Sequence, residues 1–105
     1  MEYRLKRSED FTKVFRKGTR AFSDSLTLIY FRADALKVGY AVSKKHGKSV
    51  KRNRIKRLMR EAFRPFLHQI KGNFFFVFIP KVKDDYSLAD FSKCIKFMLK
   101  KSGLI

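Results

Sequence analysis

The feature that most constrains the fold is a strongly basic segment, residues 44–64, whose apolar residues recur at helical spacing. The segment holds ten of the chain's 26 Lys and Arg residues and one acidic residue, Glu61. Its apolar positions fall at i, i+3, i+4, i+7, i+8 and i+11, which is one face of an α-helix. A helix that buries this face holds its opposite face at fixed spacing. The apolar stripe consists of Ile55, Leu58, Met59, Ala62, Phe63 and Phe66.

The outward face of this predicted helix is a row of cations. The helix should run from about residue 49 to 68, with Pro65 either kinking it or ending it near Arg64. A solvated helix face usually mixes acidic and basic residues, whereas acids are nearly absent here. Fixed cations suit a polyanion with regularly spaced phosphates. The outward row is Asn53, Arg57, Arg60 and Arg64, flanked by Arg54 and Lys56.

The start of the same helix contains an electrostatic anomaly. Lys51, Arg52 and Arg54 lie in its first turns, where cations oppose the helix dipole at a cost of about 0.3–1 kcal/mol each. A bound phosphate would compensate, because the free N–H groups, the dipole and the side chains would all point at it. We therefore expect an anion at this end of the helix.

The remaining pattern predicts two more helices and at least three strands. A first helix should begin with Ser8 as its N-cap and stop at Gly18. Strands at 26–32 and 37–43 should pair as a hairpin, with an extra strand near 21–23 as an alternative. The apolar run 74–79 predicts a central strand that is buried on both faces.

A last helix should follow a capping box formed by Ser87 and Asp90. The element order is then α-β-β-α-β-α, or α-β-β-β-α-β-α with the extra strand. This is a small α+β domain, an α/β sandwich, spanning residues 1–105 as a single domain. The inward residues of the last helix are Leu88, Phe91, Ile95, Met98 and Leu99.

The net charge of +17 indicates a polyanionic partner. A membrane is excluded by pattern, because the longest apolar run, 74–79, is too short to span a bilayer, and the N-terminus lacks the apolar segment of a signal peptide. Cys94 is the only cysteine, which excludes an internal disulfide and predicts a buried residue in a cytoplasmic protein.

The chain lacks the residues of a protein active site. His46 and His68 are its only histidines, and both are predicted to be surface or hydrogen-bonded structural groups. No Cys/His cluster has metal-ligand spacing, and no glycine-rich phosphate loop is present. We therefore expect no catalytic residue and no metal site in the protein.

Two aromatic residues of the first helix have two interpretations. Phe11 and Phe15 are spaced i, i+4 beside Val14, so they could form core or a wall on which unpaired bases stack. Alternation in the strand 26–32 places Thr27, Ile29 and Phe31 on one face. That face is the candidate for the opposite side of such a cleft.

The basic helix carries a family resemblance. Ser43-Lys44-Lys45, followed by the run from Lys51 to Arg64 with its core Arg52-Asn53-Arg54-Ile55-Lys56-Arg57, closely resembles the signature of the bacterial ribonuclease P protein component. Agreement extends to Leu5-Lys6, to Asp10 through Phe15, to Val38-Gly39 and to the apolar strand before Pro80.

The resemblance implies a ribosomal-protein-S5-domain-2-like fold, whose mixed sheet contains a left-handed βαβ crossover through the basic helix. It also implies a ribonucleoprotein subunit in tRNA processing. The protein would join a catalytic RNA that removes the 5′ leader from precursor tRNA. Mg²⁺ would be held by the RNA and the substrate, and no further protein partner would be required.

The resemblance also assigns roles to residues. Arg52, Asn53, Lys56, Arg57 and Arg60 match the family's RNA-contacting motif. Phe11 and Phe15 match the aromatic wall of a leader cleft, which Thr27, Ile29 and Phe31 would face; Ile29 stands where other members have an aromatic residue. The full predicted RNA-binding set is Lys44, Lys45, Lys48, Lys51, Arg52, Asn53, Arg54, Lys56, Arg57, Arg60 and Arg64.

An alternative class is a non-enzymatic RNA-binding protein of the ribosomal-protein or RNA-chaperone type, which shares this fold and charge. Stimulated cleavage of precursor tRNA separates the two classes. A DNA-binding protein is less favoured, because the basic helix has few Gln or Asn residues to recognise base edges.

Overall fold

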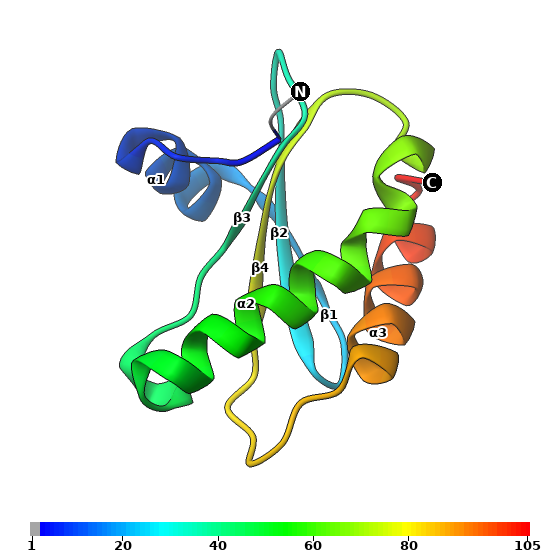
Figure 1. Cartoon of the computed structure of the whole chain (residues 1–105). Helices are drawn as coiled ribbons and strands as arrows, with labels where there is room; N and C mark the ends of the chain where they lie inside the picture. Colours follow the sequence, from blue (N-terminus) through cyan, green and yellow to red (C-terminus); the bar gives the residue numbers. More distant parts are fainter. Residues whose placement is uncertain (1–2) are drawn as a thin grey trace.

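A four-stranded sheet with the strand order β1-β2-β4-β3 forms the middle layer of the protein (Figure 1). The structure is a computed structural model that describes residues 3–105. β2 is antiparallel to both β1 and β4, whereas β3 is parallel to β4. The strands are β1 (Thr19–Phe22), β2 (Leu26–Arg32), β3 (Lys37–Tyr40) and β4 (Phe74–Pro80).

β4 occupies a central position because its side chains are apolar on both faces. Phe76 and Phe78 are fully buried in a core on one side of the sheet, and Phe75 and Val77 are buried in a second core on the other side. A strand with this sequence is stable only where both faces are covered. The predicted central strand is therefore confirmed.

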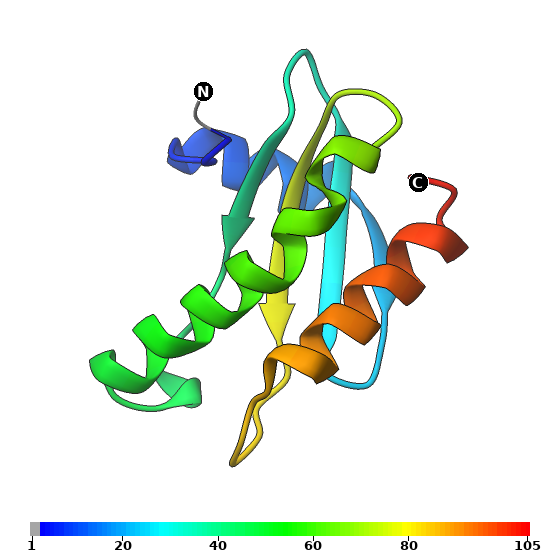
Figure 2. The ribbon, with the colours of Figure 1, turned by 45° about the vertical axis from the view of Figure 1, so that its right-hand side comes forward.

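Helices cover both faces of the sheet. α1 (Ser8–Lys17) packs on one face, and α2 (Ser49–Phe63) and α3 (Leu88–Lys101) pack on the other (Figures 1 and 2). The element order α-β-β-β-α-β-α confirms the predicted sandwich, including the extra strand, which is β1.

The connection from β3 through α2 to β4 is left-handed. In Figure 2, α2 lies in front of the sheet, both parallel strands point downward, and β4 lies to the right of β3. Nearly all such crossovers are right-handed. The handedness implied by the family resemblance is confirmed.

The predicted hairpin between 26–32 and 37–43 is wrong. β2 pairs along its whole length with β4, from Leu26 opposite Pro80 to Arg32 opposite Phe74. β3 lies on the other side of β4 and ends at Tyr40. The short connection favoured local pairing, but the apolar strand β4 inserts between the two strands and buries both of its faces.

The ends of the helices differ from the predictions in detail. Arg7, not Ser8, is the N-cap of α1, and its side chain makes no capping bond. The α-helix α2 ends at Phe63, and the chain continues as a 3₁₀-helix, η2 (Arg64–Gln69), that contains Pro65. Ser87 caps α3 as predicted by accepting a hydrogen bond from the Asp90 N–H at 3.1 Å. Leu88 is exposed, so its predicted inward position is wrong.

The N-terminal segment covers the outer edge of β3. The Leu5 N–H donates to the Val38 carbonyl at 2.9 Å, and the Val38 N–H donates to the Tyr3 carbonyl at 2.6 Å. The Leu5 side chain is buried in the core beneath α1. The segment therefore brings Arg4 alongside the sheet edge.

Candidate nucleic-acid interface

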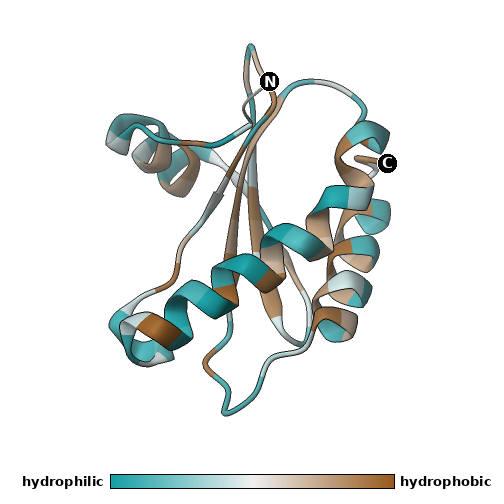
Figure 3. Ribbon diagram, viewed as in Figure 1, coloured by the Kyte–Doolittle hydropathy of each residue, from teal (hydrophilic) through white to brown (hydrophobic). Residues whose placement is uncertain are grey.

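The outward face of α2 is a fixed cationic surface. Ile55, Met59, Ala62 and Phe63 are buried in the core, which confirms the helix phase. The opposite face is hydrophilic along the helix (Figure 3). Among residues 3–105, the side chains of Asn53, Arg54 and Arg57 form no hydrogen bond or ion pair, and all three are exposed. They are free to contact an external polyanion.

Two further cations of this face have partners within the protein. The Arg60 guanidinium lies 5.9 Å from the centre of the Tyr40 ring. Arg64 Nη2 lies 2.9 Å from Glu61 Oε1 in an exposed pair, and such pairs contribute little to stability. Both arginines therefore stay accessible, but their positions are set by neighbours.

The N-terminus of α2 has no side-chain cap. Its N-cap residue, Lys48, makes no side-chain capping bond, and it follows Gly47, whose φ of 121° disfavours other residues. Arg52 Nη2 donates to Ser49 Oγ at 3.2 Å, while Arg52 Nε is buried without a partner. Lys44, Lys48 and Arg52 line a shallow depression here. Free N–H groups, the helix dipole and cations converge, as a phosphate site requires.

Lys51 differs from its neighbours because protein groups hold it. Its Nζ donates to the Asp84 carbonyl at 3.2 Å and lies 5.9 Å from the Tyr86 ring. This contact ties the start of α2 to the loop before α3. Lys51 is thus the cation in the first turns of α2 that contacts this loop.

His46 is a structural residue. It is buried, its Nε2 lies 2.7 Å from the Pro80 carbonyl, and its Nδ1 lies 3.1 Å from the Ser43 N–H. These partners fit a neutral ring that donates through Nε2 and accepts at Nδ1. The imidazole fixes the turn before α2 to the end of β4. The prediction of a hydrogen-bonded structural imidazole is confirmed for His46, and His68 is exposed.

The candidate cleft lies between α1 and the sheet. Thr27, Ile29 and Phe31 all face α1, which confirms the predicted parity of β2. Ile29 is fully buried, so it supports α1 from below and offers no surface for stacking. Thr27 and Phe31 are half-buried, and Phe15 is 38% exposed. Phe15 is thus the more accessible aromatic residue of α1.

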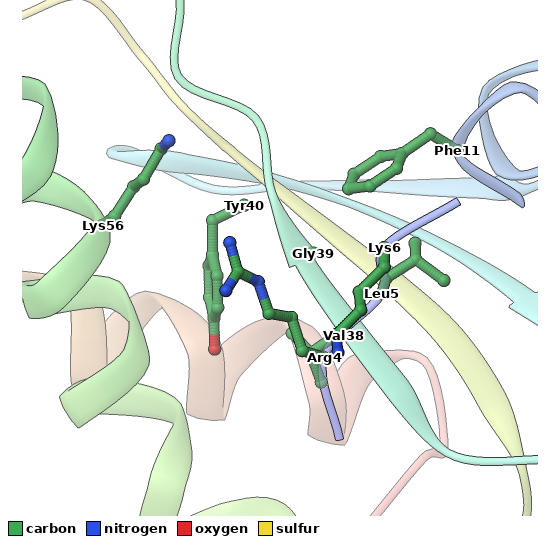
Figure 4. Close-up of a pocket in the computed structure, with 8 residues that line it drawn as sticks. All are labelled: Arg4, Leu5, Lys6, Phe11, Val38, Gly39, Tyr40 and Lys56. Atoms are coloured by element: carbon green, nitrogen blue, oxygen red, sulfur yellow. The ribbon is translucent and has the colours of Figure 1, made fainter. Parts of the chain in front are cut away.

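Phe11 reaches the edge of the sheet at Gly39. A Cβ atom on Gly39 would lie 2.5 Å from two ring atoms of Phe11, so the ring fits against the bare backbone. Phe11 and Lys56 line one cavity of about 450 Å³, together with Arg4, Lys6 and Tyr40 (Figure 4). An aromatic residue from α1 and a cation from α2 thus meet across β3.

Comparison with known proteins gives one consistent result. The sequence matches the family model for ribonuclease P over residues 1–103. It is 37% identical to the ribonuclease P protein component of Clostridium kluyveri, covering 97% of this chain and 96% of the relative. The protein component of Clostridioides difficile is also 37% identical, with 95% and 91% covered. The chain belongs to the ribonuclease P protein family.

Solved structures agree with this assignment. The RNase P protein of Staphylococcus aureus superimposes with a TM-score of 0.85 at 26% identity, covering 99% of this chain and 98% of that protein. The RNase P protein of Thermotoga maritima gives a TM-score of 0.81 at 27% identity, with 93% and 96% covered. This protein is therefore a component of the endoribonuclease ribonuclease P, and the alternative of a ribosomal protein or RNA chaperone is not supported.

The structure of this ribonuclease P protein shows where the predicted site residues lie. Within residues 3–105, no group of three or more His, Cys, Asp or Glu residues could hold a metal ion. No helix in the same part of the chain is long and apolar enough to cross a membrane. The predicted cations instead lie from Lys44 and Lys45, through the start of α2, to Arg64, and each is exposed or half-buried.

Sequence reasoning missed three residues near this surface. Arg4, Gly39 and Tyr40 line the cavity beside Phe11, but they belong to separate segments that carry no joint motif. A signal was present in Gly39, because a glycine within a strand often marks close approach by another group. Here the approaching group is the Phe11 ring.

Proposed function

We propose that the ribonuclease P protein binds the catalytic RNA through the cationic face and N-terminus of α2, and binds the 5′ leader of precursor tRNA through the cleft beside α1. The observation that supports this is the meeting of the two surfaces at one cavity, where Lys56 of α2 and Phe11 of α1 both lie. A protein that contacts both RNAs can hold the substrate in place for cleavage.

The role of the protein in this proposal is binding and charge neutralisation. Each cation that pairs with a phosphate releases a condensed counterion, which makes affinity strongly salt-dependent. Stacking of an unpaired leader base on Phe15 would add about 1–3 kcal/mol. Mg²⁺ would be held by the RNA and the substrate, and would supply the chemistry of phosphodiester hydrolysis. The described residues offer no donor set for the ion.

No further protein partner is required in this proposal, because the RNA supplies the chemistry and the protein supplies both binding surfaces. We place this activity in the cytoplasm of a bacterium. The lone, buried Cys94 is compatible with that reducing compartment.

Reconstitution tests the proposed function. The protein is mixed with a bacterial ribonuclease P RNA and precursor tRNA at a magnesium concentration too low for the RNA alone. We expect restored release of the 5′ leader. Binding of both RNAs without stimulated cleavage would contradict the proposal.

A second measurement tests the α2 surface. Arg57→Ala should weaken binding to the catalytic RNA and reduce the slope of log affinity against log salt by about 0.7–0.9, the share of one phosphate. Lys96→Ala is a matched control, because Lys96 is an exposed cation on α3, outside this surface. Equal effects of the two substitutions would argue against a specific α2 interface.

A further inference from the structure

A second cavity, of about 360 Å³, lies beside the Phe11 cavity and shares Arg4, Val38 and Tyr40 with it. We call it the Tyr40 pocket. Its volume is within the range of small-molecule sites. No residue of α1 lines it, so it is distinct from the proposed leader cleft. Its lining comes from the N-terminal segment, β3, α2 and η2: Tyr3, Arg4, Val38, Tyr40, Arg60, Phe63, Arg64 and Leu67.

The Tyr40 pocket combines an apolar interior with a cationic rim. Val38 and Phe63 are buried, and the Tyr40 ring stacks on Phe78 with centroids 6.0 Å apart and an interplanar angle of 16°. Three exposed arginines surround this interior: Arg4, Arg60 and Arg64. The pocket therefore suits a group with apolar faces and an attached negative charge.

The charges at the rim favour an anion from outside. Arg4 has no ion-pair partner among residues 3–105. Glu61 is the acidic residue that pairs with one of the three arginines, Arg64, and that pair is exposed. Arg60 contacts the Tyr40 ring, where its guanidinium retains all of its hydrogen-bond donors. At least two cations thus remain available to a phosphate.

The Tyr40 hydroxyl is available to a ligand. It forms no hydrogen bond with the described residues, and the side chain is half-buried. In Figure 4 the Arg4 side chain extends along Tyr40, whose hydroxyl points away from Phe11 and Lys56. Burial raises the pKa of this phenol, so the hydroxyl remains a neutral donor. A neutral phenol without a partner can donate a hydrogen bond to a polar atom of a ligand.

We infer that the Tyr40 pocket binds one unpaired nucleotide of an RNA. The base would lie against Tyr40, Phe63 and Leu67, with a polar edge hydrogen-bonded to the Tyr40 hydroxyl. Its phosphate would lie between Arg4 and Arg60. RNA is the occupant favoured by position, because Arg60 and Arg64 end the same cationic face of α2 that is proposed to track phosphates. The inference therefore rests on the proposed function.

Mononucleotide binding by the intact protein tests the pocket directly. Adenosine 5′-monophosphate and ribose 5-phosphate carry the same phosphate, so a difference between them measures the base. We expect the nucleotide to bind at least about fivefold more tightly, the lower bound for one stacked base, and to shift the NMR signals of Tyr40 and Leu67. Equal affinities, or shifts confined to Phe11 and Phe15, would overturn the inference.

Two substitutions locate the interaction. Tyr40→Phe keeps the ring and its contacts but removes the hydroxyl, and Arg4→Ala removes one wall while keeping the backbone bonds to β3. Tyr40→Phe should reduce the preference for the nucleotide over ribose 5-phosphate, and Arg4→Ala should weaken binding of both ligands, because both carry the phosphate. Lys96→Ala, which removes an equal charge on α3, should leave the preference and both affinities unchanged. A preference unaltered by Tyr40→Phe, or affinities unaltered by Arg4→Ala, would place the nucleotide elsewhere and overturn the inference.

The nucleotide could come from the leader or from the catalytic RNA, and the same variants distinguish these sources. If Arg4→Ala weakens binding of precursor tRNA to the assembled enzyme but not of mature tRNA, the leader supplies it. If it weakens assembly with the catalytic RNA more than Lys96→Ala does, that RNA supplies it. If Arg4→Ala causes neither of these losses, the inference is overturned. Stimulated cleavage by the unaltered protein would in that case still support the proposed function.

Discussion

Gly39→Ala is the substitution whose effect follows most directly from the structure. The new Cβ would lie 2.5 Å from the Phe11 Cε1 and Cζ atoms and 3.4 Å from the Leu5 Cβ. Carbon atoms pack at about 3.5–4.0 Å, so the Phe11 ring must move by about 1 Å or rotate out of its position. Overpacking of this kind costs about 1–3 kcal/mol of unfolding free energy.

Two assays should detect this displacement. The melting temperature should fall by roughly 4–8 °C per kcal/mol, as for other domains of this size. Affinity for precursor tRNA should fall by about fivefold or more if the ring stacks on a leader base. Affinity for mature tRNA should stay unchanged, because the mature molecule has no leader.

A second substitution tests whether the clash with the Phe11 ring causes the loss of stability. Phe11→Leu shortens the side chain that meets the new Cβ, so the double variant Gly39→Ala/Phe11→Leu should recover much of the lost stability. It should not recover the preference for precursor tRNA. Strictly additive losses of stability would refute the reasoning, since contacting residues show coupling of about 0.5–3 kcal/mol.

Four further outcomes are expected. Ile55→Ala should reduce the unfolding free energy by about 2–5 kcal/mol, measured by denaturant titration, because the side chain is fully buried. Phe15→Ala should lower affinity for precursor tRNA more than for mature tRNA with little change in melting temperature, because Phe15 is largely outside the core; equal losses would exclude it from the cleft. Above pH about 10 the folded state keeps a proton on Tyr40 that the unfolded state loses, since burial raises the folded-state pKa above 10.0. Stability should therefore fall as pH rises through that range, and Tyr40→Phe should reduce the slope. Single substitutions of the titratable residues His46, His68, Asp84 and Asp85 should not lower the rate of the cleavage step by more than about a thousandfold at saturating protein. Removal of a general acid or base could cause a loss of that size.

Local patterns were sufficient where a segment's own residues decide its structure. The apolar stripe of α2 and the Ser87 cap of α3 were both predicted, because spacing and capping are short-range properties. The pairing of β2 with β4 was not predicted. The short connection to β3 favours a local hairpin, but the seven-residue antiparallel ladder with β4 is the more stable pairing. That ladder joins residues about fifty positions apart, and nothing local encodes it.

In the candidate site, too, local features could be predicted from the sequence, and features that depend on tertiary packing could not. The α2 cations follow from helix phase, so their outward positions were predictable. The burial of Ile29 was not predictable, because it depends on how closely α1 approaches β2. That approach requires Gly18, where a Cβ would lie 2.6 Å from Ile29 Cγ2. The Tyr40 pocket likewise arises only when the N-terminal segment, β3 and α2 come together.

The central position of β4 also determines when the sheet can form. Of the three strand pairings, only β1 with β2 is possible before residues 74–80 have been synthesised. A two-stranded hairpin alone is marginal in water, and β3 has no strand partner in the sheet until then. The α2 stripe also has no β4 surface to pack against. Assembly therefore depends on contacts of large sequence separation, which slow folding, and the nascent chain exposes its basic helix before it has a core.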